Sequence, residues 1–372
     1  MLSLPKHLFV NGYQEIPKKK LGERIRLFLE ELGPTFVKMG QIASTRPDLI
    51  PADIIHELEK LQDNVAPFPY QDVKTIIEQE LGEKVENIFH EFNKIPLAAA
   101  SIGQVHYAVL KSGDRVAVKI QRPLVENTIK TDLEIFHEIA LLAENRLEWA
   151  SRYQIREIVE EFSNALLAEL DYSIEGSNSD QIANQFKNNP NIRVPKVYWE
   201  YSTKKVLTME FIEGTKLNEV EKLQKNGYNM KVLAERVTHS IFHQILIEGF
   251  YHGDPHPGNI AVLLGEVIVF MDFGMVGRLT PEMKAHFASL VIAMMRQSTD
   301  GVLKAITRMG LVPDDFNRQG LKSEIDLLKD KYYDVPLSQV SLGEAVNDLF
   351  SIAYKHHIQI PAEPNNFGSL LT

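Results

Sequence analysis

Residues 251–274 read YHGDPHPGNIAVLLGEVIVFMDFG, in which two polar stretches stand on either side of an apolar run. Asp254 and Asn259 lie five positions apart within HGDPHPGN, and Asp272 follows 18 positions after Asp254 in DFG. The apolar run divides into IAVLL and VIVFM, two short segments that are typical of paired β-strands. We therefore predict a small hairpin that holds the two polar stretches close together.

This spacing favours phosphate transfer from ATP. In kinases one Asp orients the attacking hydroxyl, while an Asn and a second Asp hold magnesium on the phosphates. We expect Asp254 in the first role and Asn259 and Asp272 as Mg2+ ligands. A lone DFG or HGD is common by chance, but the two together around a predicted hairpin are not. His252 and His256 could be taken for a metal pair, yet a histidine in such a loop more often orients the backbone, so we expect structural roles for both.

A lysine upstream fits the same chemistry. Lys119 ends VAVK (116–119), and the preceding segment QVHYAVL (104–110) is joined to it by the turn KSGD (111–114). The two segments read as a β-hairpin. In this pattern the lysine ammonium neutralises the α- and β-phosphate oxygens of the nucleotide.

The segment AAASIGQV (98–105) precedes this lysine and departs from the usual glycine-rich loop. Against the pattern G-x-G-x-x-G-x-V it places Ala98 and Ala100 where the first two glycines belong, and it keeps Gly103 and Val105. Each alanine adds a Cβ and narrows the accessible backbone conformations. We expect a stiffer loop that holds phosphates differently.

The lysine needs a carboxylate partner on a helix, and the residues alone offer two. Glu138 lies 19 positions after Lys119, which is close to the separation in an ordinary kinase. Glu169 lies 50 positions after it in AELDYSIEGSN, where Asp171 and Glu175 also gather. Such clustering costs repulsion unless cations are near. Spacing favours Glu138, whereas the acidic cluster favours Glu169.

The whole chain predicts an α+β, bilobal fold. Helical periodicity dominates residues 21–92, strand-like runs follow at 95–121, and a helical stretch covers 124–188. Strands return in VPKVYWEY and KVLTMEFIEG, and the chain is mostly helical after residue 230. We predict a helical extension at 1–94, an N-terminal lobe at 95–213 and a C-terminal lobe at 214–372. TMEFIEG (208–214) reads as the connection between the lobes, with backbone groups near Glu210 and Ile212 binding adenine.

Composition limits the possible partners. The 372-residue chain has a formal net charge of −10, which makes nucleic acid an unlikely partner. It contains no cysteine, which excludes disulfides, thiolate zinc sites and cysteine nucleophiles. It has no secretory signal pattern and no apolar run long enough to span a membrane. We expect a cytoplasmic or organelle-internal location with peripheral membrane association, and we expect the C-terminal FGSLLT to mark a truncated helix.

Taken together, KMGQ (38–41), AAASIGQV, VAVK, ELDYSIEGSN, HGDPHPGN and DFG resemble the motifs of the UbiB family of atypical kinases, the aarF-domain proteins linked to ubiquinone and other isoprenoid lipids. The resemblance runs from about residue 20 to the end of the chain, with the motifs in the family's order. It implies that the Lys-x-Gly-Gln element belongs to a helical extension folded over the mouth of the active site.

The resemblance also implies roles for individual residues. Lys38 and Gln41 would reach the cavity from above, with Gly40 between them. The Glu-x-Asp motif maps onto Glu169 and Asp171, with Glu175 opening the next element, which selects Glu169 over Glu138 as the partner of Lys119. The nucleotide-binding set implied is Ala98, Ala99, Ala100, Ser101, Gly103, Val105, Lys119, Glu210, Ile212, Lys38, Gln41, Asp171 and Glu175.

Three hypotheses for the function follow. The first is an ATP- and Mg2+-dependent phosphotransferase or ATPase that supports ubiquinone or other isoprenoid lipid metabolism at a membrane surface, with ATP or ADP bound and a lipid or quinone precursor as partner. A peptide acceptor is disfavoured because only MVGRLTPE (275–282) separates DFG from the next helix, with no Ala-Pro-Glu motif. The second is a small-alcohol kinase of the aminoglycoside or choline type. The third is a binding module that uses nucleotide as a switch without turnover.

Overall fold

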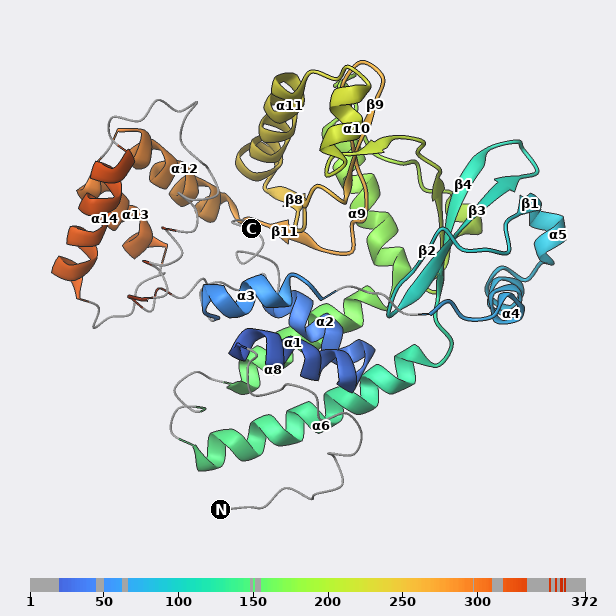
Figure 1. Ribbon diagram of the computed structural model, residues 1–372, viewed down its shortest axis with the longest axis horizontal. Coiled ribbons are helices and arrows are strands. Elements are labelled where there is room, and N and C mark those ends of the chain that lie inside the picture. The colour runs from blue at the N-terminus through green and yellow to red at the C-terminus, as the bar shows by residue number, and fades with distance from the viewer. Residues whose placement is uncertain are drawn as a thin grey trace.

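The computed structural model describes residues 20–44, 50–61, 66–147, 150, 155–296, 298–309 and 317–332, together with positions 348, 352, 355, 356 and 358. Within these residues one lobe is built on a large sheet, and the other consists of helices around short sheets (Figure 1). The predicted α+β, bilobal architecture is confirmed.

The N-terminal lobe is built on a five-stranded antiparallel sheet. Its strands are β1 (Phe89–Phe92), β2 (Ala98–Ala99), β3 (Gly103–Leu110), β4 (Arg115–Gln121) and β6 (Val206–Glu210), in the order β1-β3-β4-β6 with β2 also paired to β3. The predicted hairpin of β3 and β4 is confirmed, with Val105 opposite Lys119. Because side chains alternate along a strand, the buried Val118 and Ile120 place Lys119 on the opposite face of the sheet.

Two helices cover the buried face of this sheet, α4 (Tyr70–Leu81) and α5 (Val85–Ile88). Val73 and Ile77 of α4 are fully buried in the core that the sheet forms. The predicted boundary at residue 94 therefore does not match the packing, because α4, α5 and β1 belong to the N-terminal lobe. The change from the helical extension to the lobe falls between Leu61 and Ala66.

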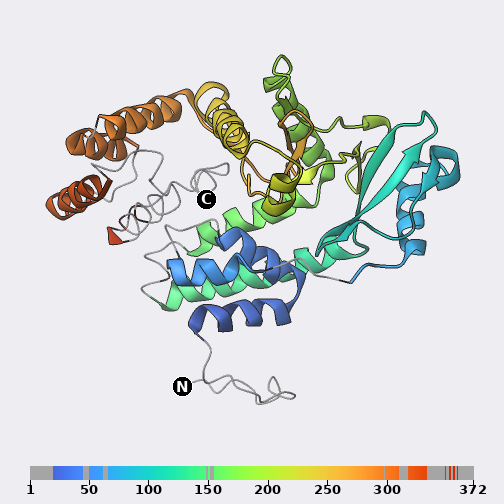
Figure 2. The same cartoon turned by 45° about the horizontal axis from the view of Figure 1, so that its top comes forward.

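The helical extension consists of α1 (Leu21–Leu32), α2 (Pro34–Ser44) and α3 (Ala52–Leu58), which we call the cover. Its three helices share a small apolar core. The cover lies against α6 (Val125–Arg146) and α8 (Ile155–Glu169), as Figures 1 and 2 both show. Met39 and Ile42 of α2 pack into the core between α6 and α8. Hydrophobic packing thus fixes where the cover sits.

The C-terminal lobe is joined to the other by α9 (Tyr172–Gln185) and β6. A sheet of order β5-β10-β9-β7 forms its centre, and the predicted hairpin of β9 and β10 is confirmed. Its strands are β5 (Ile192–Arg193), β7 (Thr215–Lys216), β9 (Ile260–Leu263) and β10 (Val267–Phe270), and a second sheet pairs β8 (Phe250–His252) with β11 (Val276–Arg278). Its helical elements are α10 (Val220–Lys225), α11 (Met230–Phe242), the π-helix η4 (His243–Glu248), α12 (Pro281–Met295), α13 (Thr299–Arg308) and α14 (Arg318–Tyr332). The short helix η3 (Trp199–Tyr201) lies beside β6, and Tyr201 packs against the core of the N-terminal lobe.

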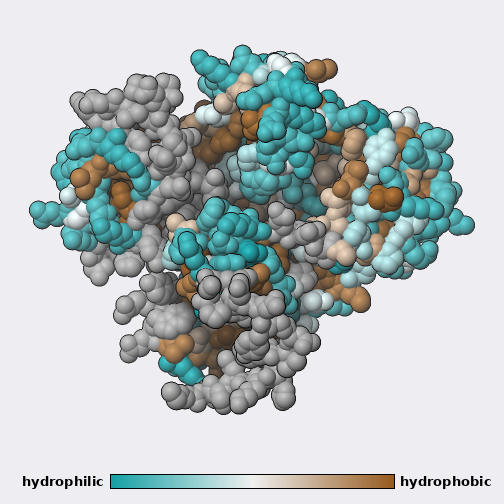
Figure 3. All heavy atoms as spheres, in the orientation of Figure 1, coloured by the Kyte–Doolittle hydropathy of each residue, from teal (hydrophilic) through white to brown (hydrophobic). Residues whose placement is uncertain are grey.

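The surface over α10 and α11 is mainly hydrophilic in the view of Figure 3. Of the helices in the described ranges, none combines the length and the apolar character needed to cross a bilayer.

Gly40 tests how closely the cover is packed. A Cβ at this position would lie 2.2 Å from Leu61 Cδ1 and 2.9 Å from Leu29 Cδ1. Alanine in a helix normally stabilises relative to glycine by about 1 kcal/mol. We expect Gly40→Ala to do the opposite and to lower the free energy of unfolding by about 1–3 kcal/mol, because the core of the cover is overpacked. Urea unfolding measures this.

Ser44→Ala in the same helix is the control for this test, and it should change stability by less than about 0.5 kcal/mol. A Gly40→Ala protein as stable as the wild type would show that α2 can separate from Leu61 at no cost.

Candidate active site

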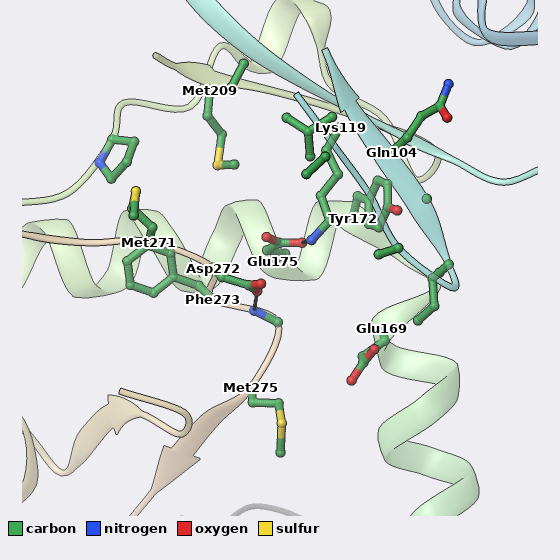
Figure 4. Close-up of a pocket in the computed structure, with 18 of the residues that line it drawn as sticks. Gln104, Lys119, Glu169, Tyr172, Glu175, Met209, Met271, Asp272, Phe273 and Met275 are labelled. Atoms are coloured by element: carbon green, nitrogen blue, oxygen red, sulfur yellow. Dashed lines mark hydrogen bonds and ion pairs between the residues drawn. The ribbon is translucent and has the colours of Figure 1, made fainter. Parts of the chain in front are cut away.

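A cavity of about 470 Å³ lies between the two lobes and gathers most of the residues that the motifs single out. Figure 4 shows it with Met209 and Met271 to one side of the Lys119–Glu175 pair and with Met275 below Asp272. The predicted residues that line it are Lys38, Ala98, Ala100, Gly103, Val105, Lys119, Glu169, Asp171, Glu175, Glu210, Ile212, Asp254 and Asp272. Ala99, Ser101, Gln41 and Asn259 are not among its lining residues.

Lys119 forms the central ion pair of the cavity. Its ammonium donates to the Glu175 carboxylate at 2.7 Å, and it lies 5.1 Å from the centre of the Tyr172 ring. Lys119 extends from β4 toward Glu175 on α9, with Asp272 nearby on the segment from the other lobe (Figure 4). The Glu175 side chain is only 6% exposed. Both lobes therefore contribute charge to one enclosed cluster.

The charges of this cluster shift one another's pKa values. The Lys119 ammonium holds the pKa of Asp272 at about 2, against the opposing effect of burial. Burial by itself lowers the pKa of Lys119, but the charges of Glu175 and Asp272 outweigh it and raise that pKa well above its usual value. Burial raises the pKa of Glu175 despite the nearby ammonium. Lys119 is thus firmly cationic and Asp272 firmly anionic.

The prediction that Glu169 fixes Lys119 is wrong in this structure. The Glu169 carboxylate pairs instead with the Lys38 ammonium of the cover at 3.2 Å. Glu138 is exposed on α6 and is not a partner either. The physical reason is a break between α8, which ends at Glu169, and α9, which begins at Tyr172. Because the chain changes direction there, the glutamate that faces β4 is the one in the first turn of α9.

Asp171 and Gln41 also have local partners. Asp171 is the N-cap of α9, where its carboxylate accepts from the Ser173 amide at 3.0 Å and from the Ser173 hydroxyl. It lines the cavity, but capping occupies one of its oxygens. Gln41 donates from Nε2 to the Leu61 carbonyl at 3.1 Å, so the expectation that it reaches the cavity is corrected. Lys38 does line the cavity, as predicted.

The alanine-rich loop is a tight turn. Ala98 and Ala99 pair with β3, and the Ala100 amide donates to the Gly103 carbonyl at 2.7 Å. A Cβ on Gly103 would lie 2.3 Å from the Tyr172 hydroxyl and 2.5 Å from the Ile120 carbonyl oxygen. Close packing therefore requires glycine at position 103.

The HGDPHPGN loop is held by its own side chains. Asn259 Nδ2 donates to the Asp254 carboxylate at 3.1 Å and to the Asp254 carbonyl at 3.2 Å, which fixes the acid and leaves Asn259 Oδ1 for other contacts. His252 accepts from the Asp254 amide at Nδ1 and donates from Nε2 to the Met271 carbonyl, so it is neutral, and burial lowers its pKa. His256 Nδ1 accepts from the Gly258 amide at 2.9 Å.

Both histidines thus orient the loop in this structure. Within the described ranges no group of three or more His, Cys, Asp or Glu side chains could hold a metal.

The loop is also tied to the DFG segment. The Met271 amide donates to the Asn259 carbonyl at 2.9 Å, and the Gly253 amide donates to the Met275 carbonyl at 2.8 Å. Asp272 lies in the left-handed region with φ of 58°, and its Oδ1 accepts from the Gly274 amide at 3.3 Å. A non-glycine residue in this conformation is uncommon and marks a position held by its surroundings.

The connection between the lobes leaves backbone groups for a ligand. The Glu210 amide donates to the Lys196 carbonyl and the Phe211 amide donates to the Arg115 carbonyl. In the described part of the chain the Ile212 amide has no backbone acceptor. The Glu210 amide is thus already used within the protein, and the binding of adenine by backbone groups near Glu210 and Ile212 stays a prediction.

A family model for the ABC1 atypical kinase-like domain matches residues 60–306, and a model for the UbiB helical domain matches residues 325–363. The chain belongs to the ABC1 family of atypical kinase-like proteins. The predicted resemblance to UbiB proteins is confirmed.

Named relatives agree with this assignment to the ABC1 family. A probable protein kinase UbiB from Marinobacter nauticus is 37% identical over 363 residues, which cover 96% of this chain and 65% of that protein. An uncharacterized protein from Synechocystis is 36% identical, covering 95% of this chain and 61% of its own length. The chain therefore spans less than two thirds of the length of these relatives.

Among solved structures, that of the Rv3197–erythromycin complex from Mycobacterium tuberculosis is similar, with a TM-score of 0.56 and 22% identity. The match covers 91% of this chain and 93% of the other, and it supports the fold alone.

Two residues of this ABC1-family site were missed by the sequence reading. Arg122 follows β4, and its Nη2 donates to the Ala100 carbonyl of the alanine-rich loop at 3.1 Å. Tyr172 is buried between Lys119 and Gly103, and its hydroxyl has no hydrogen-bond partner among the residues that the structure describes. Tyr172 lies within the ELDYSIEGSN motif and Arg122 comes three positions after Lys119, but nothing in the local sequence predicts the contact that either side chain makes.

Replacing Glu175 and Glu169 in separate variants tests whether Glu175 is the partner of Lys119. Burial lowers the pKa of Lys119, and the charge of Glu175 opposes this effect. Because Glu175→Gln removes that charge, we expect the Lys119 pKa to fall in this variant. In Glu169→Gln it should stay unchanged, because that carboxylate pairs with Lys38. An NMR pH titration of protein carrying 13C-labelled lysine measures both.

The same variants should differ in stability. Glu175→Gln should lose about 2–3 kcal/mol of unfolding free energy, less than a fully buried pair because the Lys119 side chain stays 24% exposed. A fall of the Lys119 pKa in Glu169→Gln alone would restore the original assignment.

Proposed function

We propose that the protein binds ATP with Mg2+ in the cavity between its lobes and transfers or releases the γ-phosphate, in support of ubiquinone or other isoprenoid lipid metabolism at a membrane surface. The observation that carries this proposal is the cluster of Lys119, Glu175 and Asp272, which meets Asp254 in one cavity. A firmly cationic lysine facing a firmly anionic aspartate suits a triphosphate and its metal.

The side chains present fit magnesium. Mg2+ is usually bound through one or two carboxylates together with substrate phosphates and water, rather than by a full protein cage. The ionised Asp272, which lines the cavity, provides a ligand of this type. The amide oxygen of Asn259 provides the other; Asn259 does not line the cavity itself, but its Nδ2 is bonded to Asp254, which does. Bound Mg2+ would neutralise charge on the phosphates. Lys119 would bind phosphate oxygens, and Asp254, held by Asn259, would orient the attacking water or hydroxyl and accept its proton.

A small or lipid acceptor is favoured over a peptide. After Gly274 the chain enters β11, which pairs with β8, and α12 begins at Pro281. This leaves little chain for the peptide platform of a protein kinase. The cover adds to this, because Lys38 lines the cavity and pairs with Glu169 at its edge.

An exposed apolar face of the cover favours action of the protein at a membrane surface. Leu21, Phe28 and Leu32 share a side of α1 by helical spacing, and the first two are 59% exposed. An apolar stripe of this kind suits contact with the interfacial region of a bilayer.

Phosphate release from MgATP, with and without liposomes and quinone-precursor mimics, tests the proposed activity. We expect the wild type to release phosphate, faster with lipid. Asp272→Asn should lower the rate by about 100-fold or more, because the charge that holds the metal on the phosphates is lost. The matched control is Asp300→Asn on α13, an exposed carboxylate that pairs with Lys322.

Other outcomes would point elsewhere. Equal turnover by the wild type and Asp272→Asn would contradict the proposal. Nucleotide binding without turnover under every lipid condition would favour the switch, and saturable phosphorylation of amino alcohols would favour the small-alcohol kinase.

A further inference from the structure

The segment Ala66–Phe68, which we call the strap, follows the cover and runs past the alanine-rich loop. Gln104, which comes directly after Gly103, is 1% exposed and binds both backbone groups of Phe68. It accepts from the Phe68 amide at 3.1 Å and donates to the Phe68 carbonyl at 3.3 Å. The Gln104 side chain therefore makes the two hydrogen bonds to Phe68 that the backbone of a paired strand would make.

A buried histidine fixes the orientation of this amide. His106 Nδ1 donates to the Asn93 carbonyl at 2.7 Å, so His106 Nε2 is left as an acceptor for Gln104 Nε2 at 3.0 Å. Burial lowers the pKa of His106, which keeps it neutral and able to accept. The Gln104 carboxamide therefore has one favoured orientation, the one that matches Phe68.

Arg122, which comes directly after β4, holds the same strap. Its Nη2 donates to the Ala66 carbonyl at 3.0 Å and also to the Ala100 carbonyl at 3.1 Å. Its backbone amide donates to the Ile102 carbonyl at 2.7 Å, and its guanidinium lies 5.3 Å from the centre of the Phe68 ring. A single residue thus contacts the strap and the alanine-rich loop at once.

The other end of this connection lies in the cover. Leu61 is 4% exposed, packs against Gly40, and accepts at its carbonyl from Gln41. Ala66 is five positions further along the chain, a length that spans at most about 18 Å when extended. The Lys-x-Gly-Gln element therefore holds the chain at Leu61, and Gln104 and Arg122 hold it within the strap.

We propose that Gln104 and Arg122 are positioning residues that couple the cover to the alanine-rich loop through the strap, so that the cover influences nucleotide affinity through this loop in addition to the direct approach of Lys38 to the cavity. This rests on the proposed binding of nucleotide in the cavity. A loop held in place loses less conformational freedom when it closes over phosphates, which raises affinity. By linkage, bound nucleotide stabilises the docked cover by the same free energy.

A double-mutant cycle on nucleotide affinity tests this coupling. The probe is a fluorescent ADP analogue with Mg2+, titrated into the wild type, Gln41→Ala, Arg122→Met and the double variant. Each single change removes neutral or charge-assisted hydrogen bonds and should weaken binding about fivefold. Because both act through one strap, the double variant should bind no more weakly than the weaker single variant.

A matched control separates coupling from general loosening. Arg236 also donates to two carbonyls, those of Gly265 and Glu266, but at a turn of the C-terminal lobe. Arg236→Met combined with Gln41→Ala should give effects on affinity that multiply. Gln104→Leu is the second strap variant and should repeat the result of Arg122→Met if that protein folds poorly, as judged by circular dichroism.

The outcomes are distinct. Multiplicative effects of Gln41→Ala with both strap variants would overturn the coupling while leaving nucleotide binding intact. A wild type that binds no more tightly than Lys119→Ala would overturn the proposed function, and the coupling with it. Amide hydrogen exchange gives a second readout, because nucleotide should slow exchange in α2 of the wild type and have no such effect in Arg122→Met.

Discussion

The architecture depends on one cation enclosed between two carboxylates. Lys119 comes from a strand of the N-terminal lobe, Glu175 from the helix that joins the lobes, and Asp272 from the turn after β10. Taking any one of these groups away leaves charge in an enclosed site without compensation, which is costly. Electrostatic attraction between these groups therefore helps to hold the two lobes together at the cavity.

The pair of Lys38 and Glu169 extends this pattern toward the cover. Apolar packing sets the position of this ion pair, because α2, which carries Lys38, places Met39 and Ile42 into the core between α6 and α8. The helices α6 and α8, which follow β4, thus provide the surface on which the cover packs. An ordinary kinase presents this side of the site to its substrate, whereas here a lysine from the cover reaches it.

Local patterns in the sequence predicted the parts of the site that local geometry builds. The hairpins, the HGDPHPGN and DFG segments and the strand of Lys119 follow from alternation and turn residues within about 20 positions. The partner of Lys119 could not be predicted in this way. Which of the clustered acids faces β4 depends on how the chain turns between α8 and α9, and Asp171 settles this by capping α9. The boundary at 94 failed for a similar reason, because α4 reads as one more amphipathic helix until its packing against the sheet is seen.

The alanine-rich loop differs from a glycine-rich loop in how its backbone is held. Glycine remains only at position 103, where any side chain would meet Tyr172 and the backbone of Ile120. Ala98 and Ala99 lie in ordinary strand pairing, and the amide of Ala100 is already bonded to Gly103. That amide cannot turn to a phosphate without breaking the turn that holds the loop. Because the Ala100 amide is already used in this turn, the proposed binding of phosphate would depend more on the side-chain cations that line the cavity, Lys119 and Lys38 among them, than it does beside a glycine-rich loop.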